Sequence, residues 1–306
     1  MDELRGALSA LNRRFGLGSQ LSFAAGPGGL VVAVVDNAQA SARISLQGGQ
    51  LLAWQPKDQA QPVIWLSPHA RFAPRTAIRG GMPICWPWFG AHPENPACPA
   101  HGLARVSSWQ VGATRQRDGG ETEIALDLVV SEQLRALWPH PVRASLKLTI
   151  GALLQVELTS RNEGERACQI SEALHSYFQI GDIADIRVFG LADGLYVDKV
   201  DNEARRRESG PVSFHGELDR VYIDTKATCL IEDARLARVI QIDKSGSATT
   251  VLWSPGAEKA GKMADVGADA WRQMVCVESA NALDNALNLA PGASHSLALT
   301  CAVRRL

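Results

Sequence analysis

Apolar and polar positions alternate with a period of two along most of this chain. Three such runs span residues 122–130, 144–150 and 154–158, and a fourth covers 297–303 near the C-terminus. Alternation of this kind predicts strands with one buried face. The second and third runs flank Gly151-Ala152, which predicts a tight hairpin, and residues 239–242 lead through 244–247 into 249–253, which predicts another.

The first residues follow a helical period instead. Leu4, Leu8, Leu11 and Phe15 fall on one face of a single amphipathic helix, and we expect this helix to pack on the core because its polar face is not strongly basic. Ser131 precedes a second, short helical run over residues 132–137 that ends at Pro139.

Long helical patterns between the strands are missing, which speaks against parallel βαβ units and favours an antiparallel arrangement. We therefore predict an all-β fold, a large antiparallel β-sandwich with a short N-terminal helix. Because no break in composition divides the chain, we expect residues 1–20 to form a helical extension and residues 21–306 a single β-sandwich domain.

Composition narrows the class of protein. With 306 residues, of which 46% are hydrophobic and 21% charged, the chain can bury a sizeable core. A net charge of -1 argues against capture of nucleic acid or an anionic membrane by a global field. The first residues lack the apolar core of a signal peptide, and the apolar stretch 30–35 is too short for a bilayer, so we expect a soluble cytoplasmic protein. Six cysteines without a C-x-x-C pair predict reduced, mostly buried thiols.

The segment 71–105 is the densest in candidate chemistry. Within it Glu94 is the single acid among four arginines, which are Arg71, Arg75, Arg79 and Arg105. Arginine suits a phosphate because its planar fork donates two parallel hydrogen bonds. Gly80-Gly81 would let the backbone approach a ligand, and the prolines at 83, 87, 93, 96 and 99 indicate a stiff loop. Burial in the core is the favoured interpretation of Trp86, Trp88 and Phe89, with stacking on a sugar as the alternative.

Two titratable residues stand on other predicted strands, His175 in LHSYF and Glu278 in VCVES. Each alone is more often structural, but together they offer an acid and a base at the same pH. The histidines at 69, 92, 101 and 175 are scattered without the spacing of metal ligands, so no metal is expected. The basic run 205–207 is flanked by Glu203 and Glu208, which favours a solvated loop over a nucleic-acid patch.

Several motifs occur in one order: RGGMPICWPWFG, PAHGLAR, LHSYF, LDRVY, VLWSPGAEKAGKMAD and VCVESAN. In this order they resemble the hexose-6-phosphate mutarotases, or glucose-6-phosphate 1-epimerases, of the galactose-mutarotase-like superfamily, from about Leu21 to the C-terminus. The resemblance implies the supersandwich fold of that superfamily. It also implies that His175 and Glu278 are the catalytic pair. The substrate-binding residues it implies are Arg79, Arg105, Asp219 and, from the HGLAR motif, His101. Some relatives carry glutamine where this chain has Ala100, which puts one polar contact in doubt.

The reaction implied by the resemblance interconverts the α and β anomers of an aldohexose 6-phosphate, glucose 6-phosphate first. Glu278 is expected to take the proton of O1 while protonated His175 delivers one to O5, and neither metal nor redox cofactor is required. Arg79 and Arg105 are assigned to the phosphate of this small-molecule substrate, and a monomer is expected. Two alternatives stay open, a glycosidase using Glu278 with Asp219 and a non-catalytic carbohydrate-binding or regulatory module. Spacing leaves the roles of residues 259, 262 and 265 undecided.

Overall fold

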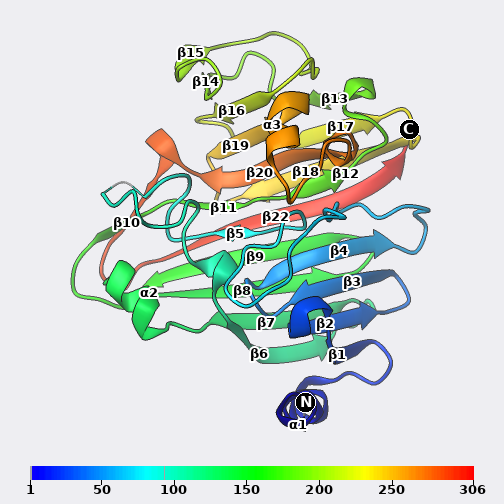
Figure 1. Cartoon of the computed structure of the whole chain (residues 1–306), viewed down its shortest axis with the longest axis vertical. Coiled ribbons are helices and arrows are strands. Elements are labelled where there is room, and N and C mark those ends of the chain that lie inside the picture. Colours follow the sequence, from blue (N-terminus) through cyan, green and yellow to red (C-terminus); the bar gives the residue numbers. More distant parts are fainter. Residues whose placement is uncertain (1, 93) are drawn as a thin grey trace.

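The computed structural model describes residues 2–92 and 94–306 and consists mainly of antiparallel strands (Figure 1). Helices are few within these residues: α1 (Asp2–Phe15), α2 (Glu132–Leu137), α3 (Gly256–Lys262) and the 3-10 turns η1 (Pro27–Gly29), η2 (Ala104–Val106), η3 (Ile183–Asp185), η4 (Ala270–Gln273) and η5 (Leu283–Asn285). Helix α1 packs on the core through Leu8, Leu11 and Phe15, as its sequence pattern predicts. At α2 the Ser131 hydroxyl accepts the Leu134 N–H at 3.2 Å, which confirms the predicted cap.

Two eight-stranded antiparallel sheets make up most of the molecule. The strands of the first, named the site sheet here, are β5 (Ile84–Cys85), β11 (Glu172–Leu174), β12 (Tyr177–Gln179), β14 (Tyr196–Asp198), β15 (Ala204–Arg206), β16 (Leu218–Tyr222), β19 (Thr249–Ser254) and β20 (Met274–Asn281). The strands of the second, named the backing sheet, are β6 (Trp109–Gln116), β7 (Thr122–Leu128), β8 (Val142–Ile150), β9 (Leu154–Asn162), β13 (Ile186–Phe189), β17 (Cys229–Asp233), β18 (Arg238–Ser245) and β22 (Ser294–Arg305).

The site sheet runs in the order β15-β14-β16-β19-β20-β11-β5, with β12 also paired to β20, and the backing sheet in the order β13-β17-β18-β22-β9-β8-β7-β6. A four-stranded and a two-stranded sheet complete the fold: β1 (Leu21–Ala25), β2 (Val31–Asp36), β3 (Ala40–Ser45) and β4 (Gln50–Pro56), then β10 (Cys168–Ile170) and β21 (Leu287–Leu289). Leu252 and Val277 of the site sheet share one apolar core with Leu158 and Leu299 of the backing sheet. The predicted antiparallel β-sandwich is thereby confirmed.

One predicted hairpin is present and the other is wrong. Strands β8 and β9 pair across the turn at residues 151–153. Strand β18, however, pairs with β17 and β22, whereas β19 pairs with β16 and β20, so residues 246–248 carry the chain from one sheet to the other. Gly246 allows this crossing, because at its φ of +63° a Cβ would lie 1.8 Å from the Ser296 carbonyl oxygen. The sequence pattern misled because β19 is buried on both faces.

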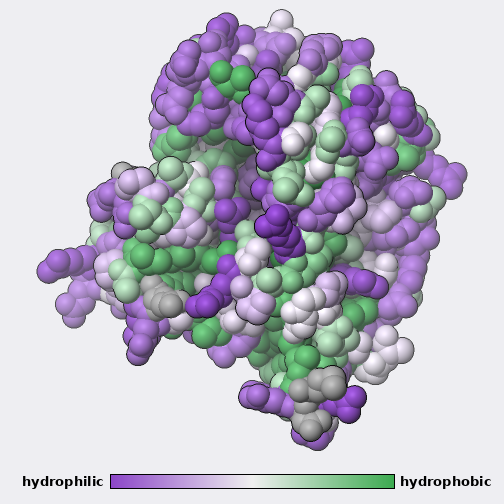
Figure 2. All heavy atoms as spheres, viewed as in Figure 1, coloured by the Kyte–Doolittle hydropathy of each residue, from purple (hydrophilic) through white to green (hydrophobic). Residues whose placement is uncertain are grey.

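The polarity of the surface, the burial of the cysteines and the length of the helices can each be compared with the expectations from sequence. Hydrophilic residues cover most of the part of the molecule formed by β14–β16 and α3 (Figure 2). All six cysteines are free and buried, as predicted. Each helix within the described residues is too short or too polar to reach across a lipid bilayer. The division into a helical extension and one domain stays a prediction.

Candidate functional site

The cross-strand register of the site sheet brings His175 and Glu278 together. Leu174 pairs with Ser279 and Tyr177 with Cys276, so His175 lies directly opposite Glu278. The expected single strand is interrupted here, because β11 ends at Leu174 and β12 begins at Tyr177. Side chains opposite each other in this way share one face of the sheet.

The two neighbouring strands extend the same face. On β19, Val251 pairs with Glu278 and Trp253 with Cys276. On β16, Val221 and Asp219 pair in turn with Val251 and Trp253. Because alternate residues of a strand share a face, these side chains form the floor of one cavity, and the residues between them point toward the backing sheet.

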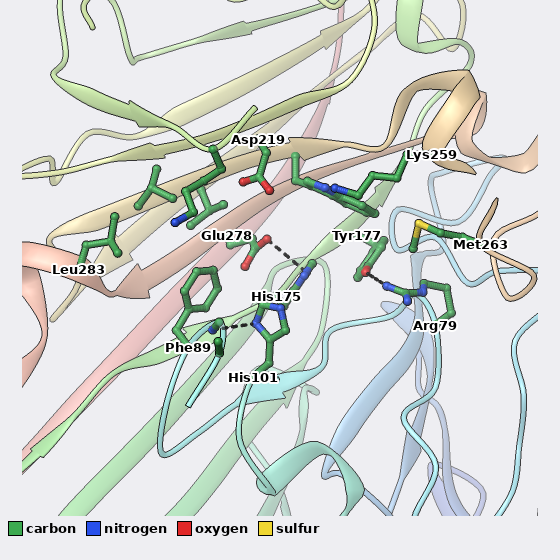
Figure 3. A pocket seen from close by; sticks show the side chains of 16 residues that line it. Arg79, Phe89, His101, His175, Tyr177, Asp219, Lys259, Met263, Glu278 and Leu283 are labelled. Atoms are coloured by element: carbon green, nitrogen blue, oxygen red, sulfur yellow. Dashed lines mark hydrogen bonds and ion pairs between the residues drawn. The ribbon is translucent and has the colours of Figure 1, made fainter. Parts of the chain in front are cut away.

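The cavity measures about 510 Å³ and is lined by five of the six residues that sequence analysis assigned to the site by motif (Figure 3). From the floor come His175, Glu278 and Asp219; from loops come Arg79 and His101. A volume of this order is the size at which small ligands are enclosed in proteins. Arg105 is not among the residues lining the cavity.

His175 and Glu278 touch each other and are almost fully buried. Their side chains approach to 3.3 Å between Nδ1 and Oε1, and the residues are 8% and 2% exposed. Tyr177 stacks parallel to the imidazole with ring centroids 4.8 Å apart, which fixes the plane of that ring. Among the described residues, neither His175 Nδ1 nor Glu278 Oε2 has a hydrogen-bond partner. These buried polar atoms are therefore free to meet a ligand.

Burial favours the uncharged form of both partners. It lowers the pKa of His175 well below its ordinary value, and the positive field of Arg105 and Arg79 acts in the same direction. It raises the pKa of Glu278 well above its ordinary value, with the carboxylate of Asp219 adding to the effect. The pocket thus stabilises a neutral imidazole beside a protonated carboxyl, so the pair holds one proton.

His101 has a defined tautomer. Its Nδ1 accepts the Gly90 N–H at 3.3 Å, and its ring lies 5.7 Å from that of His175. Burial, with Arg105 and Arg79 nearby, lowers the pKa of His101 to about 3, so the ring is neutral and its proton is on Nε2. His101 therefore presents a hydrogen-bond donor and no charge.

Arg79 is held from two sides. Its Nε donates to Asp265 Oδ2 at 3.0 Å and its Nη1 to the Tyr177 hydroxyl at 3.0 Å. These contacts give Asp265, whose role the sequence left undecided, a positioning function. Gly80 and Gly81, which follow Arg79, pack closely against neighbouring backbone. A Cβ on them would lie 2.8 Å from Leu66 Cα and 2.3 Å from the Leu51 carbonyl oxygen, so they allow close packing of protein backbone.

Of the other arginines of segment 71–105, Arg71 and Arg75 are exposed. Arg105 does not line the cavity, and its Nη2 donates to the carbonyl oxygen of exposed Ala100 at 2.7 Å, but it is close enough to lower the pKa of His175. The cations that act on the site are therefore Arg79 and Arg105 rather than all four arginines. The loop tryptophans Trp86 and Trp88 are buried in the core, as favoured from sequence.

Two lysines contribute positive charge to the cavity wall. Lys199 and Lys259 both line it, and each pairs with an acid, Lys199 with Glu203 and Lys259 with Glu217. Lys262 instead forms an exposed pair with its own helix. Sequence analysis missed Lys199, Tyr177 and Trp253. The signal for Tyr177 was its position two residues after His175, which places both on one face of the sheet.

Comparison with known proteins decides the family. A family model described as aldose 1-epimerase matches residues 31–301. The chain belongs to the aldose 1-epimerase family. It is therefore an enzyme that interconverts the anomers of a sugar.

Individual members of the aldose 1-epimerase family show how far the similarity extends. Two proteins named "Putative glucose-6-phosphate 1-epimerase" are similar to this chain: that of Salmonella typhimurium is 37% identical over 80% of this chain and 81% of its own length, and that of Escherichia coli is 36% identical over 81% and 82%. A crystal structure from Salmonella typhimurium, described as that of "a putative mutarotase", is 33% identical and superposes with a TM-score of 0.88 over 95% of this chain and 96% of that one. A galactose mutarotase-like protein from Clostridium acetobutylicum, 13% identical with a TM-score of 0.73 over 94% and 98%, shares the fold.

Proposed function

We propose that this aldose 1-epimerase interconverts the α and β anomers of an aldohexose 6-phosphate, with glucose 6-phosphate as its first substrate. The observation that carries the proposal is the buried contact between His175 and Glu278 on the floor of the cavity. The names of the bacterial relatives support the choice of substrate. A small-molecule substrate and a cytoplasmic monomer, without nucleic acid or membrane, are parts of the same proposal.

The proposed reaction needs two proton transfers and no net change in the enzyme. Glu278 as carboxylate takes the proton of O1, the C1–O5 bond breaks as C1 becomes a carbonyl, and protonated His175 gives its proton to O5. Rotation about C1–C2 presents the other face of the aldehyde. The O5 hydroxyl then attacks that face, returning its proton to His175, while Glu278 protonates the new O1.

The proton inventory of the buried pair fits this sequence. With the ring closed the proton is on His175, and with the ring open it is on Glu278, so the pair carries one proton at each stage. Burial favours the neutral pair, in which the proton is on Glu278. The proposed mechanism begins with the charged pair, in which the proton is on His175, so the proton must move from Glu278 to His175 before the ring opens. His175 Nδ1 and Glu278 Oε1 are 3.3 Å apart, so the proton has a short distance to move between the two residues.

Arg79 is proposed to hold the phosphate. Asp265 and Tyr177 fix its guanidinium at the cavity wall, and the remaining N–H groups are free to meet phosphate oxygens. Arg105 is proposed as a second phosphate ligand, because only its Nη2 donates to the Ala100 carbonyl and its buried Nε has no partner within the described residues.

The experiment is a direct measurement of anomer exchange in glucose 6-phosphate with His175→Ala and Glu278→Gln. We expect each change to slow exchange about 10²–10⁴-fold, or about 3–5 kcal/mol of transition-state stabilisation. His215→Ala, which removes an exposed histidine from outside the cavity, serves as the control. Near-normal exchange by folded His175→Ala and Glu278→Gln proteins would contradict the assignment. Tight binding of glucose 6-phosphate by the wild type without faster exchange would select the non-catalytic module instead.

A further inference from the structure

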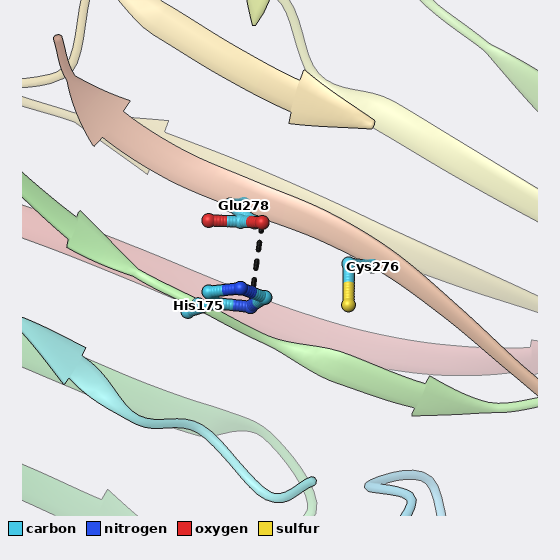
Figure 4. Close-up of side chains that lie close together, drawn as sticks. All are labelled: His175, Cys276 and Glu278. Carbon is cyan, nitrogen blue, oxygen red and sulfur yellow. Dashed lines mark ion pairs between the residues drawn. The ribbon is translucent and has the colours of Figure 1, made fainter. Parts of the chain in front are cut away.

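A third side chain completes a cluster at the buried pair. The thiol of Cys276 lies on β20 two residues before Glu278 and near the buried pair (Figure 4). Register places Cys276 directly opposite Tyr177. One ligand atom each from His175, Cys276 and Glu278 lies within 4.8 Å of the others. All three residues are buried, Cys276 completely.

The cluster has unused ligand atoms. Within the described residues, His175 Nδ1 and Glu278 Oε2 are buried without a hydrogen-bond partner. Buried polar atoms usually have partners, and atoms that lack them mark a place where a ligand or ion is accommodated. An imidazole nitrogen, a thiol and a carboxylate oxygen are also the three donor types that bind zinc in proteins.

We propose that His175, Cys276 and Glu278 form a binding site for a soft or borderline divalent cation, of which Zn²⁺ is the representative. Zinc bonds to these donors are about 2.0–2.3 Å long, so the ligand atoms need approach one another by about 1 Å, within the reach of side-chain rotation. His175 and Glu278 line the cavity, which leaves a fourth position facing it for water. On binding, the thiol proton of Cys276 and the proton held by the pair leave to solvent.

The chemistry of the donors selects the cation. A thiolate and an imidazole favour Zn²⁺ and its analogue Co²⁺ over Mg²⁺ and Ca²⁺, which prefer oxygen ligands. Scanning the sequence for ligand spacing misses this site because its donors come from two paired segments about a hundred residues apart, joined by cross-strand register.

A metal ion bound at this site is expected to inhibit anomer exchange. Zn²⁺ would occupy both proposed proton carriers, so sugar and metal exclude each other; this consequence rests on the proposed function, whereas metal binding itself does not.

Binding is tested on the full chain by titration with Co²⁺, whose thiolate complexes have a strong charge-transfer absorption. We expect this absorption in the wild type and not in Cys276→Ala, with Zn²⁺ displacing it and Mg²⁺ having no effect. Outer-shell partners alone change metal affinity about 10–100-fold, so we expect the loss of Cys276 to weaken Zn²⁺ binding at least about 100-fold. Cys301→Ala, a completely buried cysteine of the backing sheet, is the matched control. Cys276→Ser, which keeps the volume, covers the case that Cys276→Ala does not fold.

The outcomes separate the two proposals. Co²⁺–thiolate absorption in the wild type together with Zn²⁺ inhibition of anomer exchange supports both. The same absorption without inhibition supports the metal site and contradicts the catalytic roles of His175 and Glu278. Absence of the absorption in wild type, or equal absorption in folded Cys276→Ala or Cys276→Ser, overturns the metal site.

Discussion

A second buried carboxyl, Glu172, gives a prediction that depends only on the structure. Glu172 is fully buried at the end of the site sheet that faces β9. Its Oε1 accepts from Asn281 Nδ2 at 3.1 Å and lies 3.4 Å from His295 Nε2, and its Oε2 accepts from Ser160 Oγ at 3.3 Å. Ser160 and His295 belong to the backing sheet, so this carboxyl links the two layers.

Burial raises the pKa of Glu172 to about 7 from an ordinary value of 4.5, although its bonds to Asn281 and Ser160 act against the rise. The folded state therefore binds the proton more tightly than the unfolded chain does. The stability from this proton is fully present below the unfolded pKa and is lost as the pH rises through the folded one. The difference between the folded and unfolded pKa values corresponds to about 3 kcal/mol of unfolding free energy. Most of this, about 2–3 kcal/mol, is lost as the pH rises from about 5 to about 8.

The perturbation is Glu172→Gln, which keeps the size of the side chain and removes its titration. We expect the free energy of unfolding of the wild type, measured by urea titration of tryptophan fluorescence, to fall relative to that of the variant by this amount as the pH rises. The titrations of His175 and Glu278 are common to both proteins and cancel. A difference between the two proteins that does not change with pH would refute the reasoning.

Glu157→Gln is an opposite-sign control for this measurement. Lys147 lowers the pKa of Glu157 through a hydrogen bond, outweighing partial burial. Its contribution to stability is therefore present above the unfolded pKa and lost as the pH falls. The wild type should lose stability relative to Glu157→Gln on acidification, the reverse of the Glu172 result.

Two further predictions concern the phosphate and the loop that carries His101. Arg79→Ala should raise the KM for glucose 6-phosphate about 10–100-fold, the effect of losing a charge-assisted hydrogen bond, and leave exchange of free glucose nearly unchanged. Equal losses on both substrates would contradict the proposed role of Arg79. The same assay on Arg105→Ala shows whether Arg105 also contacts the phosphate. Gly102→Ala should lower the free energy of unfolding by about 2–4 kcal/mol, because at its φ of +74° a Cβ would lie 2.1 Å from the Trp86 carbonyl oxygen. The control Gly210→Ala, at a φ of +79° in open space, should cost only about 1–2 kcal/mol, and equal costs at both positions would show that the contact with Trp86 is unimportant.

Local sequence patterns predict the strands well where one face of the strand is buried and the other is exposed. Strands β7, β8 and β9 alternate cleanly, and the pairing of β8 with β9 was predictable from the turn between them. Strand β19 was predicted as a strand but paired wrongly, because burial on both faces removes the alternation that indicates which sheet it joins. Local periodicity reports the environment of a segment and not its partner across the sheet.

The site divides in the same way. Motifs predicted His175, Glu278, Asp219, Arg79 and His101, and all five line one cavity. Motifs did not reveal that Arg105 bonds to its own loop or that Arg79 is held by Asp265, because both depend on where loops meet in space. Cys276 escaped notice for a related reason: its distance from His175 is set by strand register, which no spacing along the chain encodes.

The residues proposed for catalysis and those proposed for phosphate binding come from different parts of the fold. Strand register places His175 opposite Glu278, and this pairing cannot change unless several strands slide, which would expose buried side chains. Arg79 comes from a loop and is positioned through Asp265, which lies in another loop. A change in either loop can therefore alter which group is bound at that wall without moving the proton carriers. The proposed chemistry at the anomeric carbon and the proposed phosphate contact therefore come from different elements, linked through the bond of Arg79 to Tyr177, and we expect loss of the phosphate contact to leave a working sugar epimerase.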